Sequence, residues 1–126
     1  HYEMDGIASV VAALGPLVET QGAAGVVARY RALKRDSARA YLFDEGGLSS
    51  IAYRLLDNKK PQDALIVFRL SVEEYPDASS PYYGMGQAYL ALADTSKAIA
   101  NFRRSLALDP NNQDAADALK RLGTKR

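Results

Sequence analysis

A stretch of 34 residues occurs twice in this chain, and this internal repeat restricts the possible folds more than any other feature of the sequence. The segments KKPQDALIVFRLSVEEYPD and ADTSKAIANFRRSLALDPN align without a gap, which places Ala64 opposite Ala98 and Phe68 opposite Phe102. A repeat of about 20–50 residues is typical of proteins whose units bury their apolar faces by stacking on one another. The repeat therefore predicts a stack of similar units.

Each repeated unit is predicted to contain two helices and no β-sheet. In both units the apolar residues are spaced at i, i+3, i+4 and i+7, the stripe of an amphipathic helix. This spacing predicts first helices near 46–57 and 80–92 and second helices near 61–75 and 95–108.

Prolines and capping residues support these boundaries. Proline in a first helical turn loses no hydrogen bond, whereas proline after a helix prevents its continuation. A serine or aspartate that precedes a helix can accept hydrogen bonds from its first amides. The residues concerned are Pro61 and Pro81 for first turns, Pro76 and Pro110 for helix ends, and Ser80 and Asp94 for N-caps.

Small residues on the apolar stripes predict close helix contacts. Ala52 and Gly86 on the first helices, with Ala64 and Ala98 on the second, would let helices approach closely while Phe68 and Phe102 fill the space above. Packing also explains the Gly84-x-Gly86 pair better than a phosphate-binding loop does.

Both ends of the chain are predicted to belong to the same domain. Residues 113–126 hold an amphipathic capping helix, while 1–44 form a helical hairpin with a break at Gln21-Gly22 and a hydrophobic connector at Tyr41-Leu42-Phe43. This hairpin is either a degenerate repeat or a hairpin unrelated to the repeats. The domain thus consists of four parts: the N-terminal hairpin at 1–44, the repeat units at 45–78 and 79–112, and the capping segment at 113–126.

At these repeated positions the sequence resembles the tetratricopeptide repeat (TPR) family, whose unit is a 34-residue helix–turn–helix. Leu48 and Leu55 stand where the family pattern expects large aromatic residues. The resemblance implies an all-α, right-handed helical-hairpin stack, a TPR-like superhelix, with a C-terminal capping helix. About seven helices are expected.

The resemblance also implies a concave groove lined by the first helices, which would bind a peptide or protein partner. The alternative is that these side chains pack against the N-terminal hairpin or a second copy of the chain. The candidate groove residues are Ser49, Tyr53, Leu56, Tyr83, Gln87, Leu90, Asp114, Asp117 and Arg121.

Relatives that capture the C-terminal carboxylates of chaperones use Lys, Asn and Arg on these inner faces. The matching positions here hold no cation, so no carboxylate clamp is expected. These positions are Ser49, Tyr53, Gly84, Asp114 and Ala118.

Catalysis is not expected. The 126 residues include no cysteine and one histidine, His1, so thiol nucleophiles, serine–histidine–aspartate triads and multi-histidine metal sites are excluded. We therefore predict no catalytic residues, no metal and no cofactor. Glu73 and Glu74 are adjacent on a helix and point in different directions, which disfavours a catalytic pair.

The charge pattern disfavours nucleic acid as a partner. The formal net charge is +1, and the basic cluster is interrupted by aspartates, which is typical of a solvated helix face. That cluster consists of Arg29, Arg31, Lys34, Arg35 and Arg39. No apolar run reaches the ~20 residues that a spanning helix needs. We expect a soluble protein, and the sequence leaves its compartment open.

A second resemblance concerns residues 14–110, which are similar to tails that follow the catalytic domain in bacterial serine hydrolases of the beta-lactamase-like and esterase groups. Three runs carry it: Ala28-Arg29-Tyr30-Arg31, Phe43-Asp44-Glu45 and Tyr53-Arg54-Leu55-Leu56. The start at His1 rather than Met is compatible with a fragment. The alternative function is therefore an accessory domain that docks on its own hydrolase domain.

Overall fold

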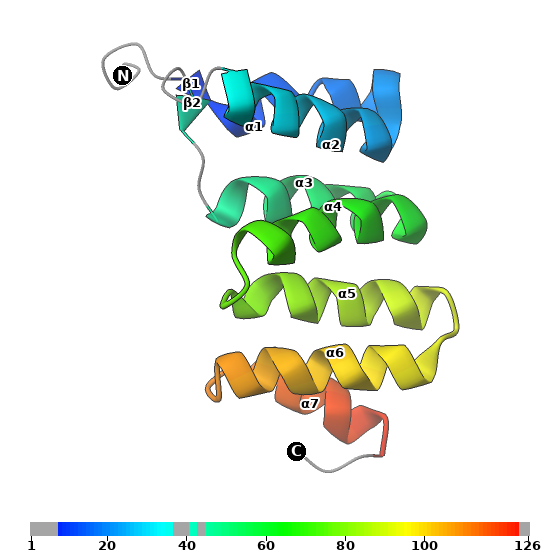
Figure 1. The fold of residues 1–126 in the computed structure, drawn as a ribbon. Helices are drawn as coiled ribbons and strands as arrows, with labels where there is room; N and C mark the ends of the chain where they lie inside the picture. Colours follow the sequence, from blue (N-terminus) through cyan, green and yellow to red (C-terminus); the bar gives the residue numbers. More distant parts are fainter. Residues whose placement is uncertain (1–7, 37–40, 43–44, 124–126) are drawn as a thin grey trace.

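Antiparallel helical pairs lie one above another in this protein, from an N-terminal layer to a single helix at the C-terminal end (Figure 1). The structure, a computed structural model, describes residues 8–36, 41–42 and 45–123. The middle pairs are α3 (Glu45–Asp57) with α4 (Pro61–Glu74), and α5 (Ser79–Ala91) with α6 (Thr95–Leu108). The predicted all-α stack of helical hairpins is confirmed.

The helices of the two middle pairs begin and end within one residue of the predicted ranges. Pro61 occupies the first turn of α4, and the Asp94 carboxylate caps α6 by accepting a hydrogen bond from the Lys97 amide at 3.2 Å. The predicted cap at Ser80 is wrong. The helix begins one residue earlier, so that Ala78 occupies the cap position and makes no side-chain hydrogen bond there.

The N-terminal layer consists of α1 (Val10–Leu14) and α2 (Leu17–Asp36). Gly22 interrupts α2 with a φ of 69° and a ψ of −176°, a conformation that glycine adopts far more easily than other residues, so the predicted break is confirmed. Val26 and Tyr30 are buried beyond this kink. That the layer is a degenerate repeat stays a prediction.

One feature departs from the expected absence of β-sheet. Strands β1 (Ala8–Ser9) and β2 (Tyr41–Leu42) pair in parallel, with Ala8 opposite Tyr41. They flank the N-terminal layer, and their backbone amide and carbonyl groups satisfy one another where no helix can do so. The pairing covers part of the predicted connector, of which residue 43 lies outside the described residues.

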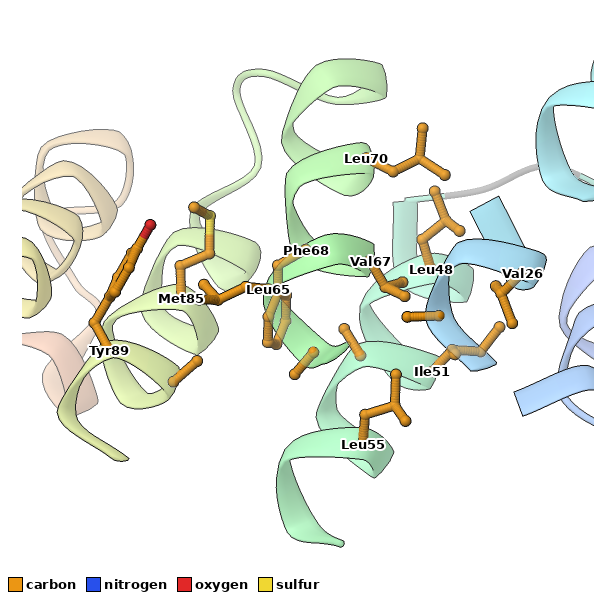
Figure 2. Close-up of a cluster of buried hydrophobic side chains, with 14 of the residues drawn as sticks. Val26, Leu48, Ile51, Leu55, Leu65, Val67, Phe68, Leu70, Met85 and Tyr89 are labelled. Carbon is orange, nitrogen blue, oxygen red and sulfur yellow. The ribbon is translucent and has the colours of Figure 1, made fainter. Parts of the chain in front are cut away.

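The hydrophobic core runs through the stack without interruption between layers. In Figure 2, Val26 of α2, Leu48 of α3 and Val67 of α4 gather on one side, while Met85 and Tyr89 of α5 lie on the other. The predicted core aromatics Phe68 and Phe102 are fully buried, and so are Ala52, Ala64 and Ala98.

The stack ends in α7 (Gln113–Arg121), which packs against α6. Ala115 and Leu119 are fully buried, and Ala118 is almost so. The opposite face is exposed and consists of Asp114, Asp117, Lys120 and Arg121. The amphipathic capping helix is therefore present, with a polar face toward solvent, as the end of a helical stack requires.

Candidate functional site

An open cleft of about 400 Å³ lies where α3, α5 and the residues leading into α7 meet. Pockets of about 300–1,000 Å³ are the size that holds small ligands, so the cleft has room for part of a partner molecule. We call it the tyrosine cleft. Its lining residues are Tyr53, Ser79, Ser80, Tyr83, Asp109, Asn112 and Asp114.

Tyr53 is held at both its ring and its hydroxyl. The ring meets Phe68 edge to face, with the two centroids 4.9 Å apart and an angle of 81° between the planes. The hydroxyl donates to the backbone oxygen of Ser80 at 2.6 Å and accepts from the Ser80 hydroxyl at 3.3 Å. Burial raises the pKa of Tyr53 above its ordinary value. The side chain is therefore neutral at physiological pH and fixed in one orientation.

Tyr83 forms a second, half-buried aromatic surface in the cleft. Its ring is tilted by 47° against that of Phe102, with centroids 5.5 Å apart. Burial raises the pKa of Tyr83, and the carboxylates of Asp114 and Asp117 raise it further, whereas the Arg121 guanidinium opposes them. Tyr83 thus lies in a local field that is set by the exposed face of α7.

Hydrogen bonds join α5, α6 and α7 at one side of the tyrosine cleft. The Ser79 hydroxyl donates to the backbone oxygen of Ser105 at 2.8 Å, and the Ser105 hydroxyl donates to the backbone oxygen of Ser79 at 2.9 Å. The Asn112 side-chain nitrogen donates to both hydroxyl oxygens, while its side-chain oxygen caps α7 at the Ala115 amide. This side of the cleft is therefore rigid.

Negative charge predominates among the groups that line the cleft. Asp109 and Asp114 are exposed, and no ion pair involves either of them within the described part of the chain. The Asp109 carboxylate accepts a hydrogen bond from the Asn111 amide at 3.1 Å. None of the seven lining residues is basic.

The structure brings together some of the groove residues that were named from the sequence. Tyr53, Tyr83 and Asp114 line the tyrosine cleft, and Asp117 and Arg121 act on Tyr83 from α7. The sequence reasoning did not find the other lining residues, which are Ser79, Ser80, Asp109 and Asn112.

The remaining groove candidates lie outside the lining of the cleft. Ser49 is buried, with 6% of its surface exposed, and its hydroxyl is 3.1 Å from that of Ser71. Leu56, Gln87 and Leu90 are half-buried.

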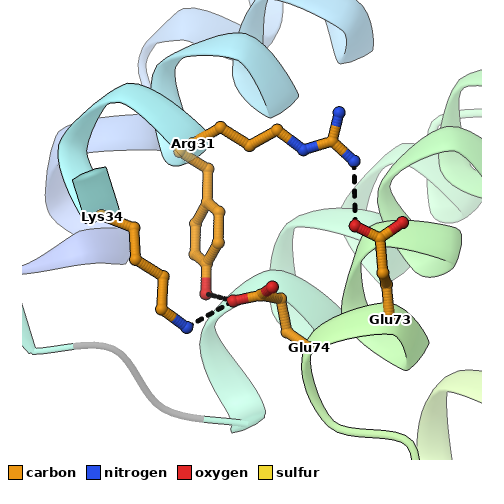
Figure 3. Close-up of polar contacts among 5 residues, drawn as sticks. Arg31, Lys34, Glu73 and Glu74 are labelled. Carbon is orange, nitrogen blue, oxygen red and sulfur yellow. Dashed lines mark hydrogen bonds and ion pairs between the residues drawn. The ribbon is translucent and has the colours of Figure 1, made fainter.

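A separate group of charged residues joins the N-terminal layer to α4 (Figure 3). Arg31 pairs with Glu73 at 3.1 Å, and Glu74 accepts hydrogen bonds from the Lys34 ammonium and the Tyr30 hydroxyl. The Lys34 and Tyr30 contacts hold the pKa of Glu74 below its ordinary value against the opposing effect of burial. Both glutamates are therefore engaged in structural contacts, and Arg31 and Lys34 pair with carboxylates. Arg39 lies outside the described residues.

Neither a metal site nor a membrane-spanning helix was found in the described ranges. No group of three or more histidine, cysteine, aspartate and glutamate residues there is arranged to hold a metal ion. No helix there combines the length and the apolar character needed to cross a bilayer. His1, as well as residues 124–126, lies outside the described residues.

Comparisons with known proteins connect this fold to protein interaction. Residues 80–112, which comprise most of α5, all of α6 and the turn into α7, match the tetratricopeptide repeat family. A segment of 51 residues is 41% identical to part of the Hsp70-Hsp90 organizing protein of Triticum aestivum. That segment is 40% of this chain and 9% of the length of the relative. Both matches support an interaction scaffold.

Proposed function

We propose that this chain is a non-catalytic scaffold whose tyrosine cleft binds an extended segment of a partner protein. The observation that carries the proposal is the pair of tyrosine side chains, Tyr53 and Tyr83, that line an open cleft between stacked helical pairs. Tyrosine offers a large apolar surface and a hydroxyl at low entropic cost, and it is enriched where proteins recognise one another.

The rigidity of the cleft supports this proposal. Tyr53 is fixed by Phe68 and Ser80, and Asn112 is fixed by Ser79 and Ser105. Side chains that are already ordered lose little further freedom when a ligand binds, so more of the contact energy contributes to affinity.

The proposed ligand is not a chaperone C-terminus, although the relative from Triticum aestivum is named for Hsp70 and Hsp90. A peptide that ends in several acidic residues would meet Asp109 and Asp114, with no lining cation to offset the desolvation of its carboxylates. Among the positions that correspond to the clamp residues of chaperone-binding relatives, Gly84 and Ala118 are buried. We expect no binding of such a peptide at micromolar concentration.

Two other functions that the sequence leaves open predict different experimental results. Self-association through the same cleft would make the apparent molecular mass in solution rise with protein concentration. The Tyr83→Ala variant would stay at the mass of the single chain, because Tyr83 would lie in the interface. An accessory role in a serine hydrolase would make the parent enzyme less stable or change its kinetics when this domain is deleted. No described contact favours either function over the binding of a foreign segment.

The test is selection of binders from a library of short random peptides, followed by calorimetry with the enriched sequences. We expect a Tyr53→Ala/Tyr83→Ala variant to lose at least about tenfold in affinity, as truncation of interface aromatics does. Thermal unfolding verifies that the variant is folded, and Tyr83→Ala alone serves if the double variant is not. Equal binding by the variants, or a library that yields no binder, would overturn the proposal.

A further inference from the structure

We infer that the tyrosine cleft accepts the cationic side chain of an arginine or lysine in an extended partner segment. This inference rests on the proposed function and adds the chemistry of the ligand. It depends on three properties of the same cleft: its tyrosine rings, its carboxylates and the absence of a cation from its lining.

The first property is the pair of tyrosine rings that line the cleft. A guanidinium or ammonium group is attracted to the face of a tyrosine ring within about 6 Å of the centroid. The protein already contains such contacts, since the Lys97 ammonium lies 5.6 Å from the centroid of Tyr89 and the Arg104 guanidinium 5.7 Å from that of Tyr82. Tyr53 and Tyr83 line the cleft, and no cation–ring contact of this kind involves them in the described chain.

The second property is the charge. Asp109 and Asp114 line the cleft and make no ion pair among the described residues, whereas Glu73 and Glu74 are both paired with cations of α2. The field of Asp114 reaches both tyrosines, because it raises the pKa of Tyr53 as well as that of Tyr83. A cation that entered the cleft would lie near both aromatic rings and this carboxylate.

The third property is the absence of a basic residue from the lining, which disfavours an anionic ligand. Arg121 is the cation that acts on Tyr83, and it is exposed on α7 beyond the lining of the cleft. Asp117 acts in the opposite direction and accepts a hydrogen bond from Gln113 at 2.8 Å. Three carboxylates against one guanidinium give the cleft and its rim a negative balance, which favours a basic segment and disfavours an acidic one.

The test uses the whole chain and a short N-acetylated, C-amidated peptide of alternating serine and arginine. Its control peptide carries citrulline, which has nearly the shape of arginine without the charge. We expect the arginine peptide to bind at least about tenfold more tightly than the citrulline peptide, since both the carboxylate and the ring contacts need the charge. The difference should shrink as salt is raised beyond about 0.1 M, where the Debye length is ~10 Å.

Matched variants locate the effect. Asp114→Asn should weaken arginine-peptide binding about fivefold, and Asp114→Glu should restore most of it, because one charge contact at a surface has roughly that effect. Asp57→Asn removes the same charge from the exposed C-terminal end of α3, outside the lining of the cleft, and should change the affinity by less than about twofold. Thermal unfolding of each variant separates a loss of fold from a loss of affinity.

Several results would overturn the inference. Equal affinity for the arginine and citrulline peptides, equal effects of Asp114→Asn and Asp57→Asn, or no binding of the arginine peptide would each do so. Library binders without arginine or lysine that still depend on Tyr83 would leave the proposed function intact and refute the cationic ligand alone. A library without any binder would refute both.

Discussion

The ring of Phe68 lies directly against the backbone of Gly84, so that a β-carbon on Gly84 would come within 2.2 Å of the tip of the ring. Phe68 belongs to α4 and Gly84 to α5, and this contact therefore sets how closely two successive helical pairs approach. Gly86 has the same relation to Phe102 within the α5–α6 pair, at 2.5 Å. Gly84 and Gly86, both on α5, thus leave room for the two core phenylalanines. Phe68 comes from α4 of the preceding helical pair, and Phe102 comes from α6 of the same pair.

Gly84→Ala should destabilise the protein even though alanine is the better helix former. Alanine would gain about 1 kcal/mol from helix propensity, but a methyl group in a filled core costs about 1–3 kcal/mol or more, and fully buried Phe68 has no room to yield. We expect a net loss of about 1–2 kcal/mol in the free energy of unfolding, measured by urea denaturation. In a Phe68→Leu background the same substitution should cost less. A gain in stability in the otherwise unaltered chain would contradict the contact.

Phe102→Ala should lower the free energy of unfolding by about 3–5 kcal/mol, because it removes a fully buried ring and leaves a cavity. The control is Ile66→Ala on α4, where 38% of the residue's surface is exposed, and this change should cost less than about 1 kcal/mol. Urea denaturation measures both, and Phe102→Leu replaces Phe102→Ala if the latter does not fold. A loss below about 1 kcal/mol at Phe102 would show that the ring is not in the core.

The helices were predictable because their signals are local. The periodic apolar stripe fixes which face is buried, and Pro61 or Asp94 fixes where a helix begins, so neither signal depends on distant residues. The role of the small residues was also predictable, because a repeated Gly or Ala beside a repeated Phe has a simple explanation in packing. The N-terminal break was visible for the same local reason, since Gly22 has the conformational freedom that it requires.

The site was harder to predict because it is assembled across layers. The cleft takes Tyr53 from α3 and Asn112 from the turn before α7, and the periodicity of each helix says nothing about the distance between them. Ser49 shows the same limit. A serine on the polar side of a stripe is expected at the surface, but a hydroxyl partner on the neighbouring helix, Ser71, allows it to be buried. Such partners become visible only when the helices are packed.

The junction between the N-terminal layer and α4 should make stability depend on pH through Glu74. Its pKa is lower in the folded protein than the ordinary 4.5, chiefly because of Lys34. The folded state therefore binds the proton of Glu74 less readily than the unfolded state does. The resulting stabilisation is complete above the unfolded pKa and is lost as the pH falls through the folded one.

We accordingly expect the unfolding free energy to fall as the pH is lowered through the ordinary Glu74 pKa of 4.5 and below it, and this slope to be shallower in Glu74→Gln. Glu73→Gln is the matched control, because the Glu73 side chain is 61% exposed and its ion-pair partner Arg31 is 55% exposed. Urea denaturation at a series of pH values measures the slope. Identical slopes for Glu74→Gln and Glu73→Gln would show that Glu74 is not the source of the pH dependence.

Asn112→Asp should destabilise the protein although aspartate is as good an N-cap as asparagine. The protons of the Ser79 and Ser105 hydroxyls are already donated to backbone oxygens, so both hydroxyl oxygens face Asn112 as acceptors. An aspartate would keep the bond from the Ala115 amide, but its second oxygen would meet two hydroxyl oxygens and would gain a donor only if one hydroxyl gave up its present acceptor. We expect a loss of about 1–3 kcal/mol in unfolding free energy, the usual cost of leaving buried polar groups unpaired.

The control for that substitution is the reverse exchange at the N-cap of α6. The Asp94 side chain accepts a hydrogen bond from the Lys97 amide and pairs with the Lys97 ammonium on the same helix at 3.8 Å, so Asp94→Asn should change the unfolding free energy by less than about 0.5 kcal/mol. Denaturation in urea at neutral pH compares the two variants. Equal effects would mean that Asn112 acts only as a cap, whereas a larger loss at Asn112 would identify its amide as the donor that joins α5, α6 and α7 beside the tyrosine cleft.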